Sequence, residues 1–183
     1  GCYSGDTRMT IMIPAWVDGT LTPVEKLEAH VKGLRHKAIS VFVMDRDHLL
    51  IQKRAAGKYH TPGLWANTCC THPEWNESGM DCAQRRLKEE LGITGLTLDQ
   101  RETLEYRAPV GGGMIEHEVV EVFVANAPDV TWDLNPDEVE AVRWVHTDAL
   151  TYDIAGNPDQ FTAWLRIYMT EHKERIFGGL IRA

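Results

Sequence analysis

The sequence predicts an α/β (α+β) fold, in which helices cover a sandwich built on a mixed β-sheet. Five segments have the composition and the bounding turns of strands, at 37–44, 49–53, 101–108, 115–125 and 139–145. Segments with helical periodicity and helix-end signals lie before, between and after these strands. Strands interleaved with a few helices are typical of this class of fold.

The first helix is predicted close to the amino terminus. Thr22 is its expected N-cap, Pro23 its first residue and Glu25 the partner that completes a capping box. The helix is expected to run to about His30 and to stop before Gly33, because a glycine in the left-handed conformation commonly ends a helix.

Two strands then form a predicted hairpin. The strand at 37–44 is rich in β-branched residues, and its neighbour covers 49–53. The turn at 45–47 joins them. A loop at 55–64, which contains glycine and proline, follows the hairpin.

A second helix is predicted to begin near Ser78 and to end at Gly92. Its apolar residues share one helical face, and they are Met80, Ala83, Leu87 and Leu91. The strands at 101–108 and 115–125 follow, joined by the glycines at 111–113, and then the strand at 139–145.

The last helix is predicted to have Asn157 as its cap and Pro158 as its first residue. An apolar stripe on this helix is expected to face the core, and it consists of Phe161, Trp164, Leu165, Tyr168 and Met169.

Length and charge limit the functions open to the chain. Its 183 residues are enough for one domain with its own core, expected over 1–183 with residues 1–9 flexible. The net charge of −8 and the lack of a basic stripe argue against nucleic acid as a partner, though not against a small anionic ligand. No apolar run reaches the roughly 20 residues of a membrane span.

Cysteine usage indicates a reducing compartment. The four cysteines, Cys2, Cys69, Cys70 and Cys82, are few for a disulfide scaffold, and adjacent cysteines seldom pair with each other. We therefore expect a cytoplasmic protein.

The most informative segment for chemistry is 65–73, which reads as the end of a strand. Side chains two residues apart in a strand point to the same side, so Cys70 and His72 are predicted to share a face. Cys69 is predicted to face the other way. A thiol beside a metal ligand indicates proton or nucleophile chemistry, whereas the alternative for Cys70 alone is a buried apolar role.

A second signal is a pair of glutamates at the start of the strand at 115–125. Glu116 and Glu118 fall on the face that continues as apolar Val120. A buried carboxylate needs a cation or a proton. From this segment alone, a functional role for two buried glutamates is as well supported as the alternative, in which both glutamates reach water at a strand end.

Histidines supply candidate metal ligands. Three imidazoles and two carboxylates would suit an octahedral divalent ion such as zinc, manganese or magnesium. The candidate ligands are His30, His36, His72, Glu116 and Glu118. The remaining histidines are interpreted as surface or core residues, and they are His48, His60, His117, His146 and His172.

The helix at 78–92 carries a third signal. Arg85 and Glu89 are spaced as an ion pair on a solvated helix face. The segment also resembles a Nudix box, in which glutamates hold a divalent metal against a diphosphate. Glu77, Arg85, Glu89, Glu90 and Gly92 match that pattern, whereas Thr71 replaces its glycine and Arg86 replaces one of its glutamates.

Together the motifs resemble the type I isopentenyl diphosphate isomerases, a family with a Nudix-like mixed β-sheet sandwich flanked by helices. The resemblance covers about 14–170. It is carried by the segments 25–30, 53–58, 62–73, 89–92, 105–108, 116–119 and 161–164.

The resemblance implies roles for these residues. It assigns His30, His36, His72, Glu116 and Glu118 to one Mn²⁺, Zn²⁺ or Mg²⁺ ion, and Glu90 to a Mg²⁺ ion that holds the substrate diphosphate. It implies that the diphosphate contacts Lys26, Arg54, Lys58 and Arg86. Cys70 and Glu118 would be the acid/base pair, with Tyr106 supporting Glu118 and Trp164 covering the hydrocarbon end.

The implied reaction interconverts isopentenyl and dimethylallyl diphosphate through a carbocation, in isoprenoid biosynthesis. The expected partner is thus a small allylic or homoallylic diphosphate, and the protein is expected to be a monomer or weak homodimer. Two alternatives are a Nudix-type diphosphate hydrolase and a non-catalytic structural zinc module. Surface charge is the alternative for Lys26, Arg54 and Lys58, and core packing is the alternative for Trp164.

Overall fold

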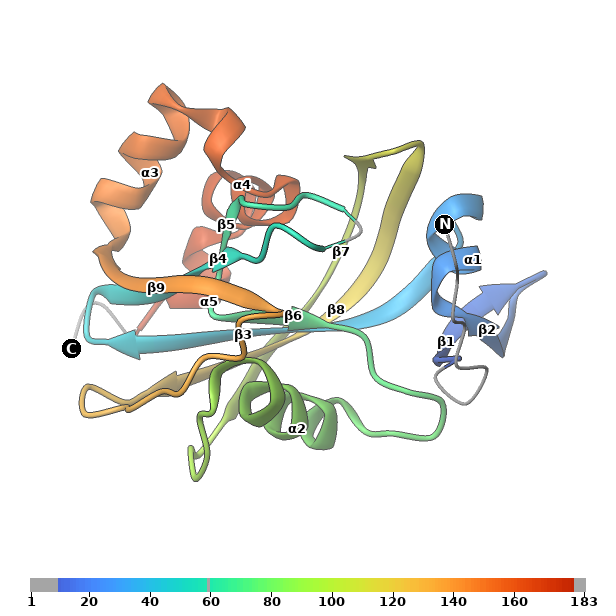
Figure 1. The fold of residues 1–183 in the computed structure, drawn as a ribbon, viewed down its shortest axis with the longest axis horizontal. Coiled ribbons are helices and arrows are strands. Elements are labelled where there is room, and N and C mark those ends of the chain that lie inside the picture. Colours follow the sequence, from blue (N-terminus) through green and yellow to red (C-terminus); the bar gives the residue numbers. More distant parts are fainter. Residues whose placement is uncertain (1–9, 59, 180–183) are drawn as a thin grey trace.

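A mixed β-sheet forms the centre of the molecule (Figure 1). The computed structural model describes residues 10–58 and 60–179. The expectation for residues 1–9, and Cys2 with it, lies outside the described residues. Among the described helices none is long and apolar enough to cross a membrane.

Nine strands make up the described sheet. They are β1 (Met12–Val17), β2 (Thr20–Glu25), β3 (Arg35–Asp45), β4 (His48–Arg54), β5 (Trp65–Ala66), β6 (Cys69–Thr71), β7 (Asp99–Gly111), β8 (Met114–Asn126) and β9 (Val139–His146). The helices are α1 (Lys26–Lys32), α2 (Gly79–Leu91), α3 (Thr147–Gly156), the 3₁₀ turn η2 (Pro158–Gln160), α4 (Ala163–Glu171) and α5 (Lys173–Phe177). The predicted class, helices on a mixed sheet, is confirmed.

Helices cover both faces of the sheet (Figure 1). α2 packs on one face, where Leu87 joins Cys69 and Phe123 in one core cluster. The helices α3, α4 and α5 cover the other face, where Leu165 and Tyr168 belong to a second cluster. Alternate residues of each central strand therefore serve different cores, as the two-residue period of a strand requires.

The long strand β3 organises the site because several strands pair with it. It runs parallel to β8, with His36 opposite Glu118, and antiparallel to β6, with Ser40 opposite Cys70. β7 pairs antiparallel with β8 and places Tyr106 opposite Glu118. The hairpin of β3 and β4 and the β7–β8 connection at the glycines are both confirmed.

The predicted start of the first helix is wrong by several residues. Thr22 and Pro23 belong to β2, where they pair with β1, and the helix begins at Lys26. Glu25 is the N-cap, and its carboxylate accepts hydrogen bonds from the backbone N–H groups of the first turn. Tertiary pairing with β1 thus overrides the local helix signal. The predicted end at Gly33 is confirmed, with Gly33 at a φ of 65°.

The carboxy-terminal helices also differ from the prediction. Asn157 and Pro158 lead into the 3₁₀ turn η2, whereas α4 begins at Ala163, capped by the Thr162 hydroxyl. The apolar stripe is buried as predicted. The helices α3 and α5 were not predicted.

One residue of the predicted α2 face lies at the surface. Met80 is 37% exposed. In this first turn Gly79 and Cys82 are buried instead, and a Cβ on Gly79 would come within 2.7 Å of the Glu121 carboxylate. The start of α2 therefore approaches β8 through small side chains, and Met80 is displaced from the contact.

Candidate active site

One pocket gathers most of the predicted site residues. Those that line it are Lys26, Arg54, Lys58, Cys70, His72, Arg86, Glu90, Tyr106, Glu116, Glu118 and Trp164, together with Thr71 and His60. His30 and His36 are fully buried and contact the two glutamates of the pocket.

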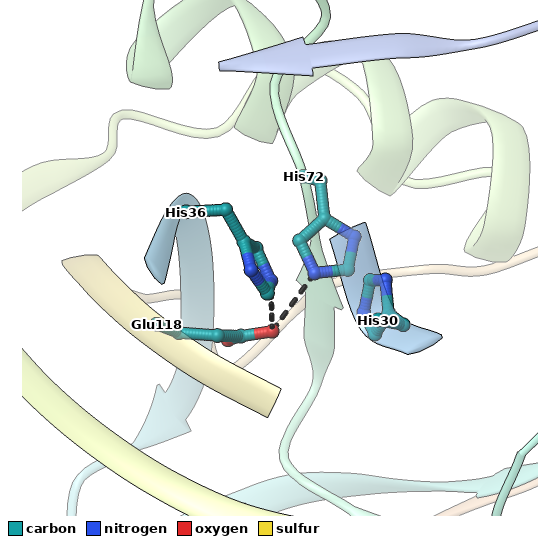
Figure 2. A group of neighbouring side chains, drawn as sticks. All are labelled: His30, His36, His72 and Glu118. Carbon is teal, nitrogen blue, oxygen red and sulfur yellow. Dashed lines mark hydrogen bonds and ion pairs between the residues drawn. The ribbon is translucent and has the colours of Figure 1, made fainter. Parts of the chain in front are cut away.

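Three imidazoles converge on one carboxylate (Figure 2). His36 Nε2 lies 3.3 Å and His72 Nε2 lies 2.8 Å from Glu118 Oε1. The potential ligand atoms of His30, His36, His72 and Glu118 all lie within 4.8 Å of one another. α1, β3, β8 and the end of β6 each contribute one of these side chains.

The histidine tautomers suit metal binding. Nδ1 of His30 lies 2.7 Å from the carbonyl oxygen of Lys26, and Nδ1 of His36 lies 2.7 Å from that of Leu34. A carbonyl oxygen only accepts hydrogen bonds, so each Nδ1 carries the hydrogen. In the neutral imidazoles the lone pair is then on Nε2, which faces the carboxylates. These residues fit a divalent cation.

The Tyr106 hydroxyl links the two buried glutamates, Glu116 and Glu118. It lies 2.7 Å from Glu116 Oε2 and 2.9 Å from Glu118 Oε2 and donates its hydrogen to this pair. Glu116 is 3% exposed and Glu118 5% exposed, so the alternative in which both reach water is wrong. Burial and the neighbouring Glu118 raise the pKa of Glu116, but the imidazoles of His30 and His60 beside it outweigh them and lower it to about 2.

His60 is the member of this cluster that sequence reasoning missed. Its Nε2 lies 3.3 Å from Glu116 Oε1, and His30, His60 and Glu116 form a second group of potential ligands. The residue lies in the irregular loop at 55–64, where no periodicity indicates which way a side chain points. Only its residue type could have marked it.

Cys70 lies on the face that the strand period predicts. Cys70 lines the pocket, whereas Cys69 is buried in the α2 core. The Cys70 thiol donates a hydrogen bond to Asn67 Oδ1 at 2.9 Å, and Ser40 Oγ lies 3.2 Å from its sulfur. Burial raises the pKa of Cys70, with Glu118 contributing in the same direction. The thiol is therefore the form present near neutral pH.

Ser40 continues this network into the core. Its hydroxyl lies 2.8 Å from that of Tyr168 on α4. Ser40 and Tyr168 are separated by 128 residues in the sequence. Ser40 and Asn67 were not singled out from the sequence, and Tyr168 was predicted only as part of the apolar stripe, because nothing local to each residue indicates the contact.

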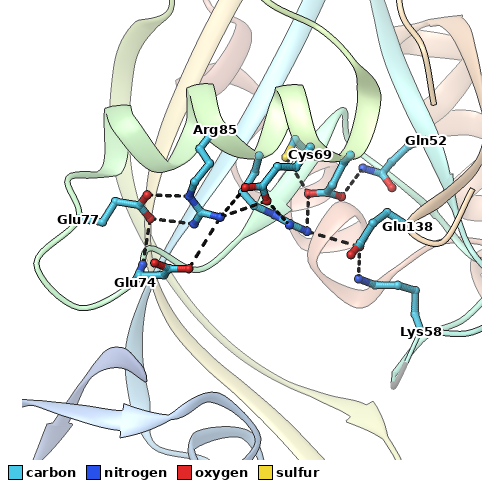
Figure 3. A network of polar contacts seen from close by, with 10 residues as sticks. Gln52, Lys58, Cys69, Glu74, Glu77, Arg85 and Glu138 are labelled. Carbon is cyan, nitrogen blue, oxygen red and sulfur yellow. Dashed lines mark hydrogen bonds and ion pairs between the residues drawn. The ribbon is translucent and has the colours of Figure 1, made fainter. Parts of the chain in front are cut away.

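Cations gather at the other end of the pocket (Figure 3). Lys58 forms an ion pair with Glu138, and Arg86 Nη2 lies 3.4 Å from the carboxylate of the same Glu138. Burial, with the charges of Lys58 and Arg86 acting in the same direction, lowers the pKa of Lys26 to about 8. An anionic ligand would relieve this repulsion.

Glu90 belongs to the cationic end and lies outside the histidine cluster. Its Oε2 lies 3.4 Å from Arg86 Nη2 and accepts a hydrogen bond from the Cys69 thiol at 3.2 Å. Gln52 Nε2 lies 3.5 Å from its other oxygen. The predicted separation of Glu90 from the five-ligand site agrees with this placement.

An arginine and a tryptophan form the wall between these two ends. The Arg54 guanidinium lies 5.2 Å from the centre of the Trp164 ring. Arg54 is 7% exposed and Trp164 2% exposed, and the Arg54 Nε and Trp164 Nε1 atoms are buried without a hydrogen-bond partner. Trp164 therefore both packs in the core and contributes a surface to the pocket.

The Nudix-like segment has an internal structural role at its start. Arg85 donates two hydrogen bonds to the Glu77 carboxylate, at 2.7 and 2.9 Å, and also contacts Glu89 (Figure 3). These contacts hold the loop before α2 against the helix. The predicted ion pair between Arg85 and Glu89 is confirmed.

Comparison with known families identifies the domain type. The NUDIX domain family matches residues 34–165. The curated isopentenyl-diphosphate Delta-isomerase of Roseobacter denitrificans is 66% identical over 94% of this chain and 98% of its own length. The protein of the same name from Dinoroseobacter shibae is 60% identical over 93% of this chain and 97% of its own length.

Solved structures with low sequence identity share the fold. A Deinococcus radiodurans protein superimposes with a TM-score of 0.68 at 13% identity, covering 86% of this chain and 96% of that one. The MutT NUDIX hydrolase of Burkholderia pseudomallei gives a TM-score of 0.58 at 22% identity, covering 75% and 98%. These likenesses concern the fold alone.

Proposed function

The chain belongs to the Nudix family and, within it, to the isopentenyl-diphosphate Delta-isomerases, and on that premise we propose how its pocket performs the reaction. The enzyme moves the carbon–carbon double bond between isopentenyl diphosphate and dimethylallyl diphosphate. The observation that supports this proposal is that a neutral thiol, Cys70, and a buried carboxylate, Glu118, line the same pocket beside a cluster of cations.

Two groups exchange protons with the substrate. Isomerisation adds a proton at C4 and removes one from C2, with a tertiary carbocation between the two steps. Cys70 and Glu118 supply these two groups, one adding and the other removing a proton, so the substrate gains and loses one in total. Their separate hydrogen-bond partners, Asn67 for the thiol and Tyr106 for the carboxylate, hold each in place.

The diphosphate is the handle by which the substrate is held. Lys26, Lys58 and Arg86 offer cationic donors from three different elements around the same end of the pocket, with Arg54 beside them. Glu90 would help to hold a Mg²⁺ ion that accompanies the diphosphate. Binding energy from this remote group can then orient the five-carbon chain at the reacting end.

The histidine site has the ligands for a divalent ion. His30, His36, His72, Glu116 and Glu118 would hold one Mn²⁺, Zn²⁺ or Mg²⁺ ion, whose positive charge would keep the carboxylates ionised and fixed. Tyr106 orients both carboxylates from behind. The structural zinc alternative is disfavoured because such sites prefer four closed ligands, often cysteines.

Trp164 covers the hydrocarbon part of the substrate. Its ring is buried beside the pocket, from which water must be kept while the carbocation exists. A desolvated cation over an indole face is stabilised by about 2 kcal/mol.

The pocket residues all come from one chain, so no partner copy is needed to complete the proposed site. The described cysteines, Cys69, Cys70 and Cys82, are all free, which supports a reducing, cytoplasmic setting.

Isotope incorporation tests the function directly. Incubating the protein with isopentenyl diphosphate and Mg²⁺ in deuterated water is expected to give dimethylallyl diphosphate labelled in its methyl group, because the added proton comes from an exchangeable group of the enzyme. NMR of the product measures the label. Unlabelled starting material with no allylic product would refute the proposal.

Arg86 helps to distinguish the isomerase from the hydrolase alternative, because in the isomerase it contacts the substrate diphosphate. In the isomerase, Arg86→Gln is expected to raise KM for isopentenyl diphosphate about tenfold or more, equivalent to about 1.4 kcal/mol of lost binding, because one diphosphate contact is removed. Steady-state kinetics measures this change.

The matched control is Lys88→Gln, an exposed residue of the same helix, which is expected to leave KM unchanged. Phosphate release from a panel of diphosphates by the unaltered protein, without isomerisation, would instead favour a hydrolase.

A further inference from the structure

The two groups of potential metal ligands share one residue. His30 belongs both to the group with His36, His72 and Glu118 and to the group with His60 and Glu116. Its Nδ1 faces the carbonyl oxygen of Lys26, so only Nε2 is directed at both groups. One nitrogen lone pair serves one ion. The second group is therefore an extension of the first site and does not form an independent centre.

Glu116 is held from two sides within this extension. Tyr106 donates to its Oε2, and His60 Nε2 approaches its Oε1 at 3.3 Å, on the same oxygen that lies 3.6 Å from His30 Nε2. The two contacts leave the carboxylate little freedom to rotate. They direct Oε1 toward the imidazole of His30.

The loop orients His60 for this contact. Its Nδ1 lies 2.9 Å from the Thr61 hydroxyl, whose hydrogen can be donated to Nδ1 and so leave the ring hydrogen on Nε2. Thr61 has a φ of 45°, which is unusual for a β-branched residue. Such strain persists only where surrounding contacts fix the backbone.

We propose that His60 is a positioning residue of the metal site, which donates its Nε2 hydrogen to Glu116 and holds that carboxylate for the ion. The inference rests on the proposed function for the presence of the ion. It separates His60 from the ligands themselves, since His60 acts through Glu116 and makes no bond to the metal.

The same residue connects the metal end of the pocket with its hydrocarbon wall. The His60 ring lies edge-on to Trp164, with 5.8 Å between ring centres, and stacks on His30 at the same spacing. Its carbonyl oxygen accepts a hydrogen bond from Arg54 Nη2 at 3.2 Å. A shift of His60 would therefore disturb Glu116, Trp164 and Arg54 together.

Metal affinity tests this proposal without using turnover. His60→Leu removes the donor and keeps an apolar side chain, whereas His60→Gln keeps an N–H donor. Zn²⁺ affinity is measured by competition with a chromophoric chelator, and the Co²⁺-loaded proteins are compared by their visible absorption. Loss of a hydrogen-bond partner of a ligand typically weakens metal binding about 10–100-fold.

We expect His60→Leu to lose about 10–100-fold in Zn²⁺ affinity and His60→Gln to recover most of it, with the Co²⁺ spectrum of His60→Gln unchanged. The control is His48→Leu, a half-exposed histidine that pairs with Asp47 away from the site, which should bind Zn²⁺ like the unaltered protein. If His60→Leu does not fold, the Co²⁺ spectrum and Zn²⁺ affinity of His60→Gln still show whether His60 acts through Glu116 or binds the metal directly.

Two kinds of result would overturn the inference. Unchanged affinity in His60→Leu would show that the contact does not matter to the ion. Weak binding in a folded His60→Gln, or a Co²⁺ spectrum that has lost a nitrogen ligand, would show that His60 binds the metal directly. Absence of isomerase activity in the unaltered protein would refute the proposed function and leave these binding results in force.

Discussion

Replacing Cys70 with alanine is expected to abolish measurable isomerisation. Removal of a positioned acid or base typically costs about 10²–10⁴-fold in rate, and no other described thiol lines the pocket. The fold should persist, because Ser40 keeps its 2.8 Å contact with Tyr168 and the change removes only one small side chain. The turnover number and the melting temperature measure the two effects.

Cys82→Ala is the matched control for this substitution. Cys82 is also a buried cysteine, but it lies in α2 and packs in the core on the other face of the sheet. We expect its turnover to match that of the unaltered protein. Full activity in Cys70→Ala would remove the thiol from the mechanism.

Replacing Glu118 with glutamine should affect catalysis and metal binding together. The carboxylate lies within hydrogen-bond distance of His36 Nε2, His72 Nε2 and the Tyr106 hydroxyl, and it is both a proposed acid/base group and a proposed metal ligand. A neutral amide cannot exchange the proton, so a loss of about 10²–10⁴-fold in turnover is expected. Metal saturation should also fail to stabilise the variant.

Thermal unfolding with and without metal measures the second effect. A ligand at 100 times its dissociation constant stabilises the folded state by about 2.7 kcal/mol, and chelation removes that gain. Glu105→Gln, at an exposed glutamate of β7 paired with Arg35, should keep both activity and the metal response. A Glu118→Gln variant that is stabilised like the unaltered protein and turns over normally would contradict the assignment.

Much of the site follows from the two-residue period of strands. That period predicted that Cys70 and His72 share a face, that Cys69 faces away, and that Glu116 and Glu118 continue an apolar face. The structure confirms each of these placements. The signal was strong because one face of each strand is buried, so the direction of every side chain affects packing.

Contacts between distant segments could not be found in this way. Thr22 and Pro23 have the local signature of a helix start, and only the pairing with β1 turns them into strand residues. His60 lies in a loop without periodicity, and its contact with Glu116 depends on the path of that loop. Ser40 reaches Tyr168 because β3 passes beneath α4, which no local pattern in either segment reveals.

The alternation of side chains along β8 restricts where residues can be inserted or deleted in this chain. Glu116 and Glu118 face the pocket, whereas Glu121 and Phe123 face α2. A single-residue insertion or deletion inside the strand would exchange these faces and carry the carboxylates to the wrong side of the sheet. The tight β7–β8 turn, with glycines at positive φ, is where such length variation could be absorbed.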